Sequence, residues 1–326
     1  MEEKALTSNV MMIRPHNFGF NEQTAKTNKF QKKTNSSVNL QALKEFNRAV
    51  ETLRMNGINV FVFDDLTEID TPDSIFPNNW VSFHPDGTTV VYPMLALNRR
   101  NERRPDIIQN LSMLYGFSCS KVIDLTYYEN KNKFLEGTGS LVLDRENNIA
   151  YACLSERTNE EVLNKFCSEM KYKPIKFHAY DETGFPIYHT NVMMALGGKF
   201  VMICLDSITD EGEKKAVVSA IKDSGKTLIE LTFKQILDFA GNALELLDSI
   251  GNKKLVISKK ALNSLSKEQK YEIEKYCDII SIDVSTIEEC GGGSIRCMLA
   301  EIFLPQRKGI KTTAKNPFKK GRSRIR

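Results

Sequence analysis

The sequence predicts an α/β protein whose repeated units are arranged radially or in a stack around one core. A unit of strand, turn, strand, helix and strand recurs about every 45–55 residues, a spacing typical of repeat architectures. The 326 residues are 41% hydrophobic and 26% charged, a composition that supports a sizeable buried core. No Pro/Gly/Ser-rich linker divides the chain, so we expect a single domain over residues 9–305 and a basic, flexible tail over residues 306–326.

The predicted elements follow from apolar runs of period two and from amphipathic stretches of helical period. The first unit is irregular, with a strand at residues 9–13, a helix at 40–55 that Gly57 ends, and a strand at 60–63. Each later unit has two strands joined by a turn, then a helix and a third strand. We expect these elements, unit by unit, at residues 74–83, 88–93, 103–115 and 121–125; 139–143, 149–154, 160–170 and 173–177; 190–196, 200–205, 211–223 and 227–231; and 243–247, 254–258, 267–276 and 279–283.

Charge separates the tail from the body of the chain. The last twenty residues, 307–326, hold nine Lys and Arg and no acid, whereas the other 306 residues hold 36 basic and 41 acidic side chains, a net charge of −5. A mildly acidic body is not that of a nucleic-acid-binding domain. A protein that associates with RNA or a membrane surface through its tail remains an alternative to a solvated extension.

Hydropathy and cysteine usage indicate the compartment and argue against a metal site and a disulfide framework. No stretch approaches the roughly 20 apolar residues of a membrane span, and the N-terminus lacks the pattern of a signal peptide. We therefore expect a cytoplasmic protein. Seven cysteines and four histidines show neither a C-x-x-C pair nor a zinc-ligand spacing, so we expect no metal and no disulfide framework.

Unusual polar residues gather beside turns in four segments. Three of the segments lie at the start of a predicted strand or strand-like run, and equivalent strand ends in a radial fold point at one central site. We expect the four segments to meet there; they are residues 72–80, 135–140, 188–191 and 291–297.

Cys297 is the candidate nucleophile in this constellation. The glycines at 291–293 can adopt positive φ and let backbone N–H groups approach a ligand; the alternative is a buried cysteine that begins a strand at residues 298–304. His189 is the candidate acid and base, and Glu136 could orient its imidazole. A structural histidine and an exposed turn carboxylate are the alternatives, because the three groups act together only if they meet in space.

At these segments the chain resembles the guanidino-group modifying, or pentein, superfamily. It is most similar to arginine-deiminase-related proteins called citrulline-utilisation hydrolases, often labelled amidinotransferases, and more distantly to the dimethylarginine dimethylaminohydrolases. The start of the chain, residues 12–15 (MIRP), 21–25 (NEQTA) and Asn28, carries part of the resemblance, which spans residues 9 to 305. It implies a five-bladed α/β propeller, in agreement with the repeat.

The resemblance also implies a set of substrate-binding residues. The dimethylarginine group has a P-D-x-x-F-x-E-D segment, matched here by PDSIFPNN at 72–79, in which Asp73 is retained. Its arginine pair matches Arg99 and Arg100, and its S-x-R-T-N run matches residues 155–159 with Arg157. The family assigns these arginines to the substrate α-carboxylate and the aspartate to the α-amino group.

Three asparagines depart from the family pattern. Asn78 and Asn79 stand where that segment has acids, and Asn191 stands where the deiminase H-x-D motif has aspartate. A guanidinium group is a cation with donors only, which suits carboxylates, whereas a carboxamide offers an acceptor and a donor pair to a neutral ureido group. The asparagines therefore favour citrulline over arginine, unless other acids such as Asp64 or Asp65 replace the lost charge.

These arguments predict a hydrolase of C–N bonds other than peptide bonds, acting on the ureido or guanidino group of a free amino acid without a metal or organic cofactor. The favoured reaction is citrulline to ornithine. In it Cys297 attacks the ureido carbon, and His189, held by Glu136, moves the protons. The alternatives are an amidinotransferase, an arginine deiminase or dimethylargininase, and a non-catalytic amino-acid-binding protein. The sequence leaves the oligomeric state open.

Overall fold

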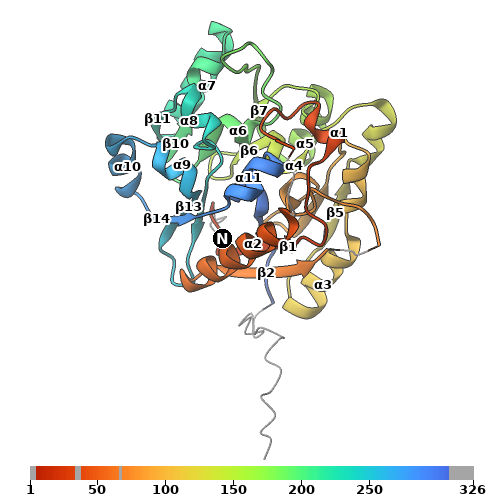
Figure 1. The fold of residues 1–326 in the computed structure, drawn as a ribbon. Coiled ribbons are helices and arrows are strands. Elements are labelled where there is room, and N and C mark those ends of the chain that lie inside the picture. Colours follow the sequence, from red (N-terminus) through yellow and green to blue (C-terminus); the bar gives the residue numbers. More distant parts are fainter. Residues whose placement is uncertain (1–4, 34–37, 66–67, 308–326) are drawn as a thin grey trace, which may run out of the picture.

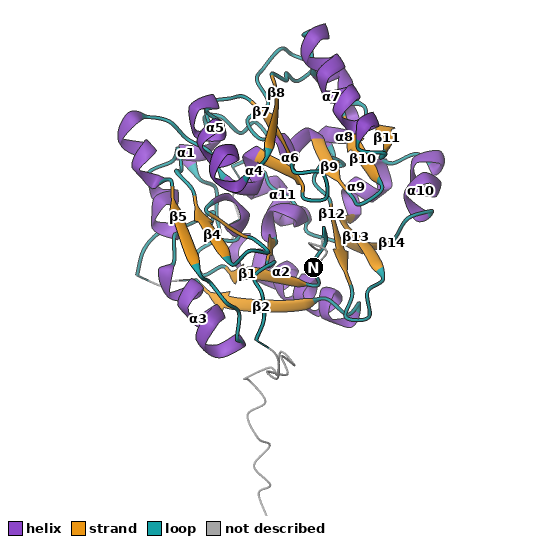
Figure 2. Cartoon of the chain, turned by 180° about the vertical axis from the view of Figure 1, so that it is seen from behind, coloured by secondary structure: helices purple, strands orange, loops and turns teal. Residues whose placement is uncertain are grey.

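A computed structural model describes residues 5–33, 38–65 and 68–307, and Figure 1 shows their fold. In this part of the chain the strands form five three-stranded sheets, each with one antiparallel and one parallel pair. The sheets surround a common centre, with α3, α5, α7 and α10 at the periphery (Figures 1 and 2). This arrangement confirms the predicted five-bladed propeller. In spatial order the strands are β15 (Ala300–Glu301), β1 (Asn9–Arg14) and β2 (Asn59–Asp64); β3 (Val81–Phe83), β4 (Thr88–Val91) and β5 (Lys121–Asp124); β6 (Leu141–Asp144), β7 (Ile149–Cys153) and β8 (Lys173–Phe177); β11 (Thr227–Glu230), β10 (Phe200–Ile203) and β9 (Met194–Leu196); and β12 (Leu244–Leu247), β13 (Lys253–Ser258) and β14 (Asp278–Ile282).

The first blade closes the ring by joining the two ends of the chain. Strand β15 pairs antiparallel with β1, so it takes the place that the first hairpin strand has in the other four blades. The Thr7 hydroxyl donates to the Ile302 carbonyl at 2.8 Å, and the Ile302 N–H donates to the Asn9 carbonyl at 2.9 Å. This explains why the first unit of the sequence is irregular, since the strand that corresponds to the first strand of the other units comes from residues 300–301.

The longer helices are the parallel crossovers, and each buries one stripe of apolar side chains. In α2 (Val38–Met55) the stripe Ala42, Phe46, Ala49 and Leu53 has the three- and four-residue spacing of one helix face, and all four are fully buried. The other α-helices are α1 (Glu22–Ala25), α3 (Pro105–Tyr115), α4 (Gly137–Ser140), α5 (Glu160–Met170), α6 (Thr190–Met193), α7 (Glu211–Asp223), α8 (Phe233–Leu237), α9 (Lys259–Ser264), α10 (Lys267–Glu274) and α11 (Ser285–Gly291). Short 3₁₀ turns are η1 (Pro77–Asn79), η2 (Asn98–Glu102), η3 (Thr126–Lys131), η4 (Leu205–Ser207) and η5 (Ile295–Met298).

Three predicted strands are shorter than expected because each begins with a helical turn. Residues 74–80 are turns and η1 rather than strand, since Pro77 has no N–H to give to a ladder. Helices α4 and α6 likewise replace the first residues of the strands predicted at 139–143 and 190–196. At Thr190 the side chain takes the place of a backbone partner: its hydroxyl accepts from the Cys153 N–H at 2.7 Å and donates to the Ser140 carbonyl at 2.6 Å.

Four short helices, α1, α8, α9 and α11, were not predicted. For α8 the sequence does carry a signal, because Thr232 and Gln235 form a capping box of the S/T-x-x-E/Q type. Residues 308–326, nearly all of the predicted tail, lie outside the described residues. Within the described part of the chain, no helix is long and apolar enough to cross a membrane.

Candidate active site

The turns that precede the innermost strand of each blade converge on the centre of the ring. η1 precedes β3, α4 precedes β6, α6 precedes β9, the turn at Asn242 precedes β12, and η5 precedes β15. A cavity lies among three of these turns, η1, the start of α6 and η5, and the segment around α1. The residues that line it are Thr24, Asn28, Gln31, Asp73, Phe76, Asn79, Arg99, Arg157, Tyr188, His189, Gly291, Gly292, Gly293 and Cys297. Six of the nine predicted site residues, Cys297 among them, are in this lining.

His189 and Glu136 form a buried hydrogen-bonded pair. His189 Nε2 lies 2.9 Å from Glu136 Oε2, and both side chains are almost completely buried. Burial lowers the pKa of His189 to about 4, against the opposing effect of Glu136. The imidazole is therefore neutral at pH 7. Because an ionised carboxylate only accepts hydrogen bonds, Nε2 carries the proton and Nδ1 is left with a lone pair that can accept one.

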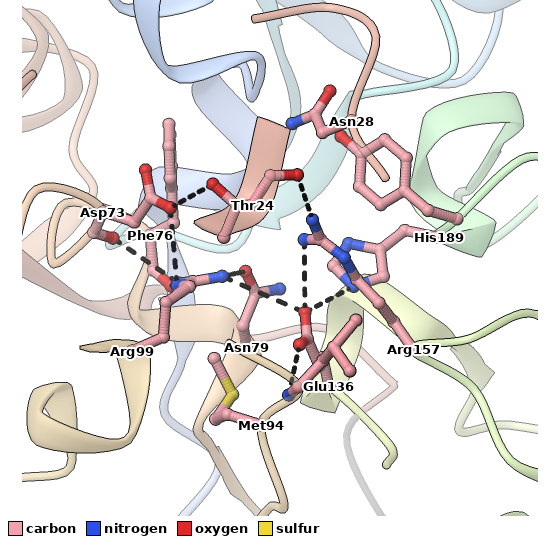
Figure 3. Close-up of polar contacts among 12 residues, drawn as sticks. Thr24, Asn28, Asp73, Phe76, Asn79, Met94, Arg99, Glu136, Arg157 and His189 are labelled. Carbon is pink, nitrogen blue, oxygen red and sulfur yellow. Dashed lines mark hydrogen bonds and ion pairs between the residues drawn. The ribbon is translucent and has the colours of Figure 1, made fainter. Parts of the chain in front are cut away.

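Glu136 remains ionised because cations surround it. Burial alone would raise its pKa, but Arg157, His189 and Arg99 outweigh burial and lower the pKa to about 2. Arg157 Nη1 lies 3.5 Å and Arg99 Nη1 4.0 Å from Glu136 Oε2, and the other oxygen accepts from the Leu95 N–H at 3.0 Å. Figure 3 shows these contacts. The carboxylate thus has no freedom to turn away from His189.

Gly139 lets the histidine approach the neighbouring blade. A Cβ atom at this position would lie 2.7 Å from His189 Nδ1 and 2.4 Å from Asn79 Nδ2. Any side chain there would displace both groups, so the glycine is required by close packing.

Cys297 lies on η5 and not in the strand that the alternative reading predicted, and it is 7% exposed. Two carboxamides approach its sulfur: Asn242 Nδ2 at 3.2 Å and Asn191 Nδ2 at 3.5 Å. Sequence reasoning did not find Asn242. Its signal was its place in the repeat, two residues before the first strand of the fifth blade.

Asn79 presents a donor to the cavity. Its Oδ1 accepts from Arg99 Nη1 at 2.7 Å, which fixes the orientation of the carboxamide, and its Nδ2 has no hydrogen-bond partner among the described residues. Asn78 is completely buried but does not line the cavity, so its predicted contact with substrate is not supported by its position.

Arg99 is committed to the protein interior. Its guanidinium donates to both Glu102 oxygens, at 2.9 and 2.8 Å, as well as to Asn79 and to the Phe76 carbonyl. Glu102 was not predicted, although it follows Arg99 at the three-residue spacing of a helical ion pair. Arg100, the second member of the predicted pair, turns to the Met94 carbonyl instead. Arg99 therefore fits a role in orienting Asn79 better than a role as a carboxylate clamp.

Arg157 and Asp73 are joined through the segment that contains α1. Arg157 donates to the Thr24 carbonyl at 2.8 Å and from Nε to the Thr27 hydroxyl at 2.9 Å, and its guanidinium lies over the Tyr188 ring. Asp73 Oδ2 accepts from the Thr24 hydroxyl at 3.0 Å. The other oxygen, Oδ1, is buried and has no hydrogen-bond partner among the described residues.

The glycines at 291–293 contribute differently from the prediction. Of the three, only Gly292 has a positive φ, of 63°. Its carbonyl accepts from Asn28 Nδ2 at 3.2 Å and from the Tyr188 hydroxyl at 3.0 Å, while a Cβ on Gly291 or Gly293 would lie about 3 Å from the Phe76 ring. These glycines therefore supply carbonyl acceptors and close packing rather than a nest of N–H donors.

The other predicted groups lie elsewhere. Asp64, which was considered as a replacement for the lost charge, pairs with Arg14 near the surface, and Asp65 accepts from the Thr71 hydroxyl; neither lines the cavity. Among the residues that the structure describes, no group of three or more His, Cys, Asp or Glu side chains is placed to hold a metal ion.

A ring of five α/β blades with a cysteine, a histidine and a carboxylate at its centre defines a pentein, and the hydrolases of this superfamily cleave C–N bonds other than peptide bonds. The chain belongs to the family described as N,N dimethylarginine dimethylhydrolase, eukaryotic, whose sequence profile matches residues 14–304. The predicted superfamily and the predicted class of hydrolase are thereby confirmed. The match is with the group that the motifs resembled more distantly.

Solved structures show the same fold at low sequence identity. ArgZ, an arginine dihydrolase from the ornithine-ammonia cycle in cyanobacteria, superposes with a TM-score of 0.70 at 15% identity over 93% of this chain and 42% of its own. The chain thus spans less than half of full-length ArgZ. It covers 99% of the ArgZ N-terminal domain, seen as a cysteine-to-serine variant bound to substrate, with a TM-score of 0.69, 15% identity and 91% of this chain covered.

A dimethylarginine dimethylaminohydrolase is a second kind of structural neighbour. A histidine-to-glycine variant of that enzyme, in an adduct with S-methyl-L-thiocitrulline, superposes with a TM-score of 0.60 at 14% identity over 91% of this chain and all of its own. None of the curated protein sequences compared with the chain matches it.

Proposed function

We propose that the protein hydrolyses the guanidino group of a free amino acid of the arginine class, arginine or an N-methylated arginine, through a covalent intermediate on Cys297. Unpaired acceptors on three side chains at or beside the cavity carry this proposal. Asp73 lines the cavity, and Asn191 and Asn242 donate from Nδ2 to Cys297; Oδ1 of each of the three has no hydrogen-bond partner in the described residues. A guanidinium group has donors only, so it complements such a set. The family to which the chain belongs supports the same class of substrate.

The neutral histidine supports proton transfer from the thiol. His189 Nδ1 takes the proton of the Cys297 thiol, the sulfur bonds to the guanidinium carbon, and the C=N electron pair moves onto nitrogen. The proton then passes from His189 to the distal nitrogen, and the C–N bond breaks to release ammonia or an alkylamine.

Hydrolysis of the intermediate returns the enzyme to its starting state. A water molecule gives one proton to His189 and bonds to the same carbon, and the C=N electron pair moves onto nitrogen. As the carbonyl of citrulline forms, the C–S bond breaks, the sulfur takes back the proton held by His189, and the hydroxyl proton is released to solvent. Glu136 keeps Nε2 protonated throughout, so that Nδ1 is the nitrogen that exchanges protons.

Two charged side chains at the cavity suit the amino-acid end of the substrate. Arg157 offers Nη1, whose protein contact is the 3.5 Å ion pair with Glu136, to an α-carboxylate. Asp73 Oδ1 offers an unpaired carboxylate oxygen to an α-ammonium group or to the guanidinium. We propose these two residues as substrate-binding groups, with Arg99 as a positioning residue behind Asn79.

Citrulline is the second candidate substrate, and the orientation of Asn79 favours it. Because Arg99 holds Oδ1, the carboxamide turns its N–H groups to the cavity, where they can donate to a ureido oxygen. Attack of Cys297 on citrulline would release ornithine in the first step instead of ammonia.

The test is to identify products from arginine, monomethylarginine, asymmetric dimethylarginine and citrulline by mass spectrometry, each with and without an amine acceptor. We expect citrulline and an amine from the guanidino substrates. Ornithine formed from citrulline would establish the second candidate, and transfer of the amidino group to the acceptor would indicate an amidinotransferase. Binding of all four without products would overturn the proposal in favour of a binding protein.

Cys297→Ala is the matched control. It should abolish turnover and leave the circular dichroism spectrum unchanged, and iodoacetamide should label Cys297 in the unmodified protein before the other six cysteines. Normal activity in Cys297→Ala would exclude a covalent mechanism on this residue.

A further inference from the structure

Resting on the proposed role of Cys297 as nucleophile, we propose that Asn242 is a further catalytic residue, which donates a fixed hydrogen bond to the sulfur and stabilises the thiolate that forms when His189 takes the thiol proton. Asn242 belongs to the fifth blade, which supplies neither member of the His189–Glu136 pair. Its Nδ2 lies 3.2 Å from Cys297 Sγ, closer than that of Asn191 at 3.5 Å.

The orientation of the Asn242 carboxamide is determined by the backbone. The same Nδ2 donates to the Asn191 carbonyl at 3.0 Å, and a carbonyl oxygen can only accept. The nitrogen must therefore face this side, so the group that meets the sulfur is a donor. With 2% of the residue exposed, no rotation into solvent is available to it.

The turn that carries Asn242 has little room to move. A Cβ on Gly241 would lie 2.5 Å from the Val192 carbonyl oxygen, so this turn packs directly against α6. The Asn242 N–H donates to the Phe239 carbonyl at 2.8 Å, and Phe239 holds a positive φ of 64°, an unusual conformation for a bulky residue. The donor is thus preorganised before any substrate binds.

Within the protein, the Asn242 carboxamide is only partly paired. Its Oδ1 is buried without a hydrogen-bond partner among the described residues, and such an atom destabilises a fold. Its Nδ2, by contrast, meets the sulfur of the candidate nucleophile.

The Asn242 donor is important because His189, neutral at pH 7, brings no positive charge to the sulfur until it takes the thiol proton. The titratable and charged groups near the sulfur are His189, Asp73, Arg99 and Arg157 in the cavity lining, with Tyr188 beside them and Arg296 next in the chain. Arg99 and Arg157 donate to protein atoms, and Arg296 donates to the Leu299 carbonyl. Among the described residues, the hydrogen bonds to the sulfur come from Asn242 and Asn191, and preorganised N–H donors of this kind stabilise developing anions.

The test compares Asn242→Ala and Asn242→Asp with a control variant, Asn59→Ala. Asn59 lies on β2, and its side chain donates to the Asn9 side chain on β1. Two quantities are measured: the rate at which iodoacetamide alkylates Cys297 without substrate, followed by intact mass across pH, and steady-state turnover of the best substrate. In Asn242→Ala we expect alkylation at pH 7 to slow about tenfold, the alkylation profile to move to higher pH, and kcat to fall about 100-fold with KM changed less than threefold. Asn242→Asp, which replaces the donor with a carboxylate oxygen, should be slower still.

Alkylation and kcat within twofold of the wild type in Asn242→Ala would overturn the proposal. If Asn242→Ala does not fold, as judged by circular dichroism, the nearly isosteric Asn242→Asp decides the question by the same two readouts. If the wild type turns over none of the substrates, the proposed function fails, while the alkylation rates still decide whether Asn242 stabilises the thiolate.

Discussion

Single side chains at the centre of the ring are held by partners that cannot themselves move. Asn79 is the clearest case, because Arg99 fixes its oxygen and the Glu102 carboxylate fixes Arg99. The orientation of the Asn79 carboxamide is therefore determined by buried contacts that begin at Glu102, outside the cavity lining. Replacing this carboxamide by a carboxylate tests whether Asn79 selects the charge of the substrate.

Asn79→Asp should move specificity toward arginine. One carboxylate oxygen would keep the Arg99 contact, and the other would replace the N–H donor with an acceptor for a guanidinium. We expect the ratio of kcat/KM for arginine over citrulline to rise about tenfold or more, measured on the same preparation so that losses of stability cancel.

Asn78→Asp is the matched control, because Asn78 is the adjacent buried asparagine but lies outside the cavity lining. It should lower stability without moving the ratio. An unchanged ratio in Asn79→Asp, or one that moves toward citrulline, would show that Asn79 does not select the substrate charge.

The buried pair predicts a specific acid sensitivity of the fold. The pKa of His189 is lowered from 6.5 to about 4, so between these values the unfolded chain binds a proton that the folded chain excludes. The free energy of unfolding should therefore fall as pH falls from 6.5 to 4, by on the order of 3 kcal/mol. Glu136, whose pKa is lowered from 4.5 to about 2, adds a further loss below pH 4.5 with the same sign.

Urea unfolding at pH 7 and pH 5 measures this effect. His189→Gln cannot titrate and should lose less stability over that interval than the wild type. His178→Gln, at an exposed histidine paired with Glu213, should behave like the wild type. Equal losses in all three proteins would mean that His189 is not the group responsible.

At the scale of elements, helix α11 depends on a carboxylate from another helix. Glu45 of α2 accepts from the Thr286 N–H at 3.1 Å and from the Ile287 N–H at 3.2 Å, at the N-terminus of α11. A carboxylate at this end satisfies free N–H groups and interacts favourably with the helix dipole. Because α11 ends at Gly291 and both Gly291 and the next residue, Gly292, line the cavity, Glu45 connects the first crossover helix to the site.

Glu45→Ala should lower the free energy of unfolding by about 1–3 kcal/mol, because it leaves the buried Ile287 N–H and the half-buried Thr286 N–H without an acceptor. Glu45→Gln, which keeps an acceptor and removes the charge, should cost less. The urea midpoint measures both, and Glu51→Ala at an exposed position of α2 is the control. A loss in Glu51→Ala as large as that in Glu45→Ala would point to helix propensity instead of the cap.

At the scale of the whole molecule, the two ends of the chain share one sheet. Strand β15 supplies the antiparallel neighbour of β1, and the backbone of Ile302 accepts from the Thr7 hydroxyl and donates to the Asn9 carbonyl. The first blade is therefore complete only when the last described strand has been added. We propose that residues 9–305 form the folding unit and that the basic tail is outside it.

Truncation separates these two parts. A chain ending at Arg307 should keep the melting temperature and the activity of the full-length protein. It retains β15 and Ile302, which make the contacts that close the first blade. A chain ending at Leu299 lacks β15 and should not fold cooperatively, as measured by calorimetry. A large loss of stability in the chain ending at Arg307 would place the tail within the folding unit.

The sequence by itself determined the elements whose pattern is local. The helix Glu160–Met170 and the strand Lys173–Phe177 are found at their predicted residues, because apolar period and capping residues act over a few positions. The repeat, together with the turns before strands, also indicated which segments meet, and Cys297 and His189 do line one cavity. The class of hydrolase followed from the motifs.

Only the tertiary structure decided the contacts between segments that are distant in the sequence. The helical turns before β3, β6 and β9, the pairing of Arg99 with Glu102 and Asn79, and the approach of Asn242 to Cys297 depend on which blades face each other. No local pattern encodes the direction in which a carboxamide points, since its partners are contributed by other blades. A motif therefore predicts which residues gather at the centre, and packing determines whether each one meets the substrate, the nucleophile or another side chain.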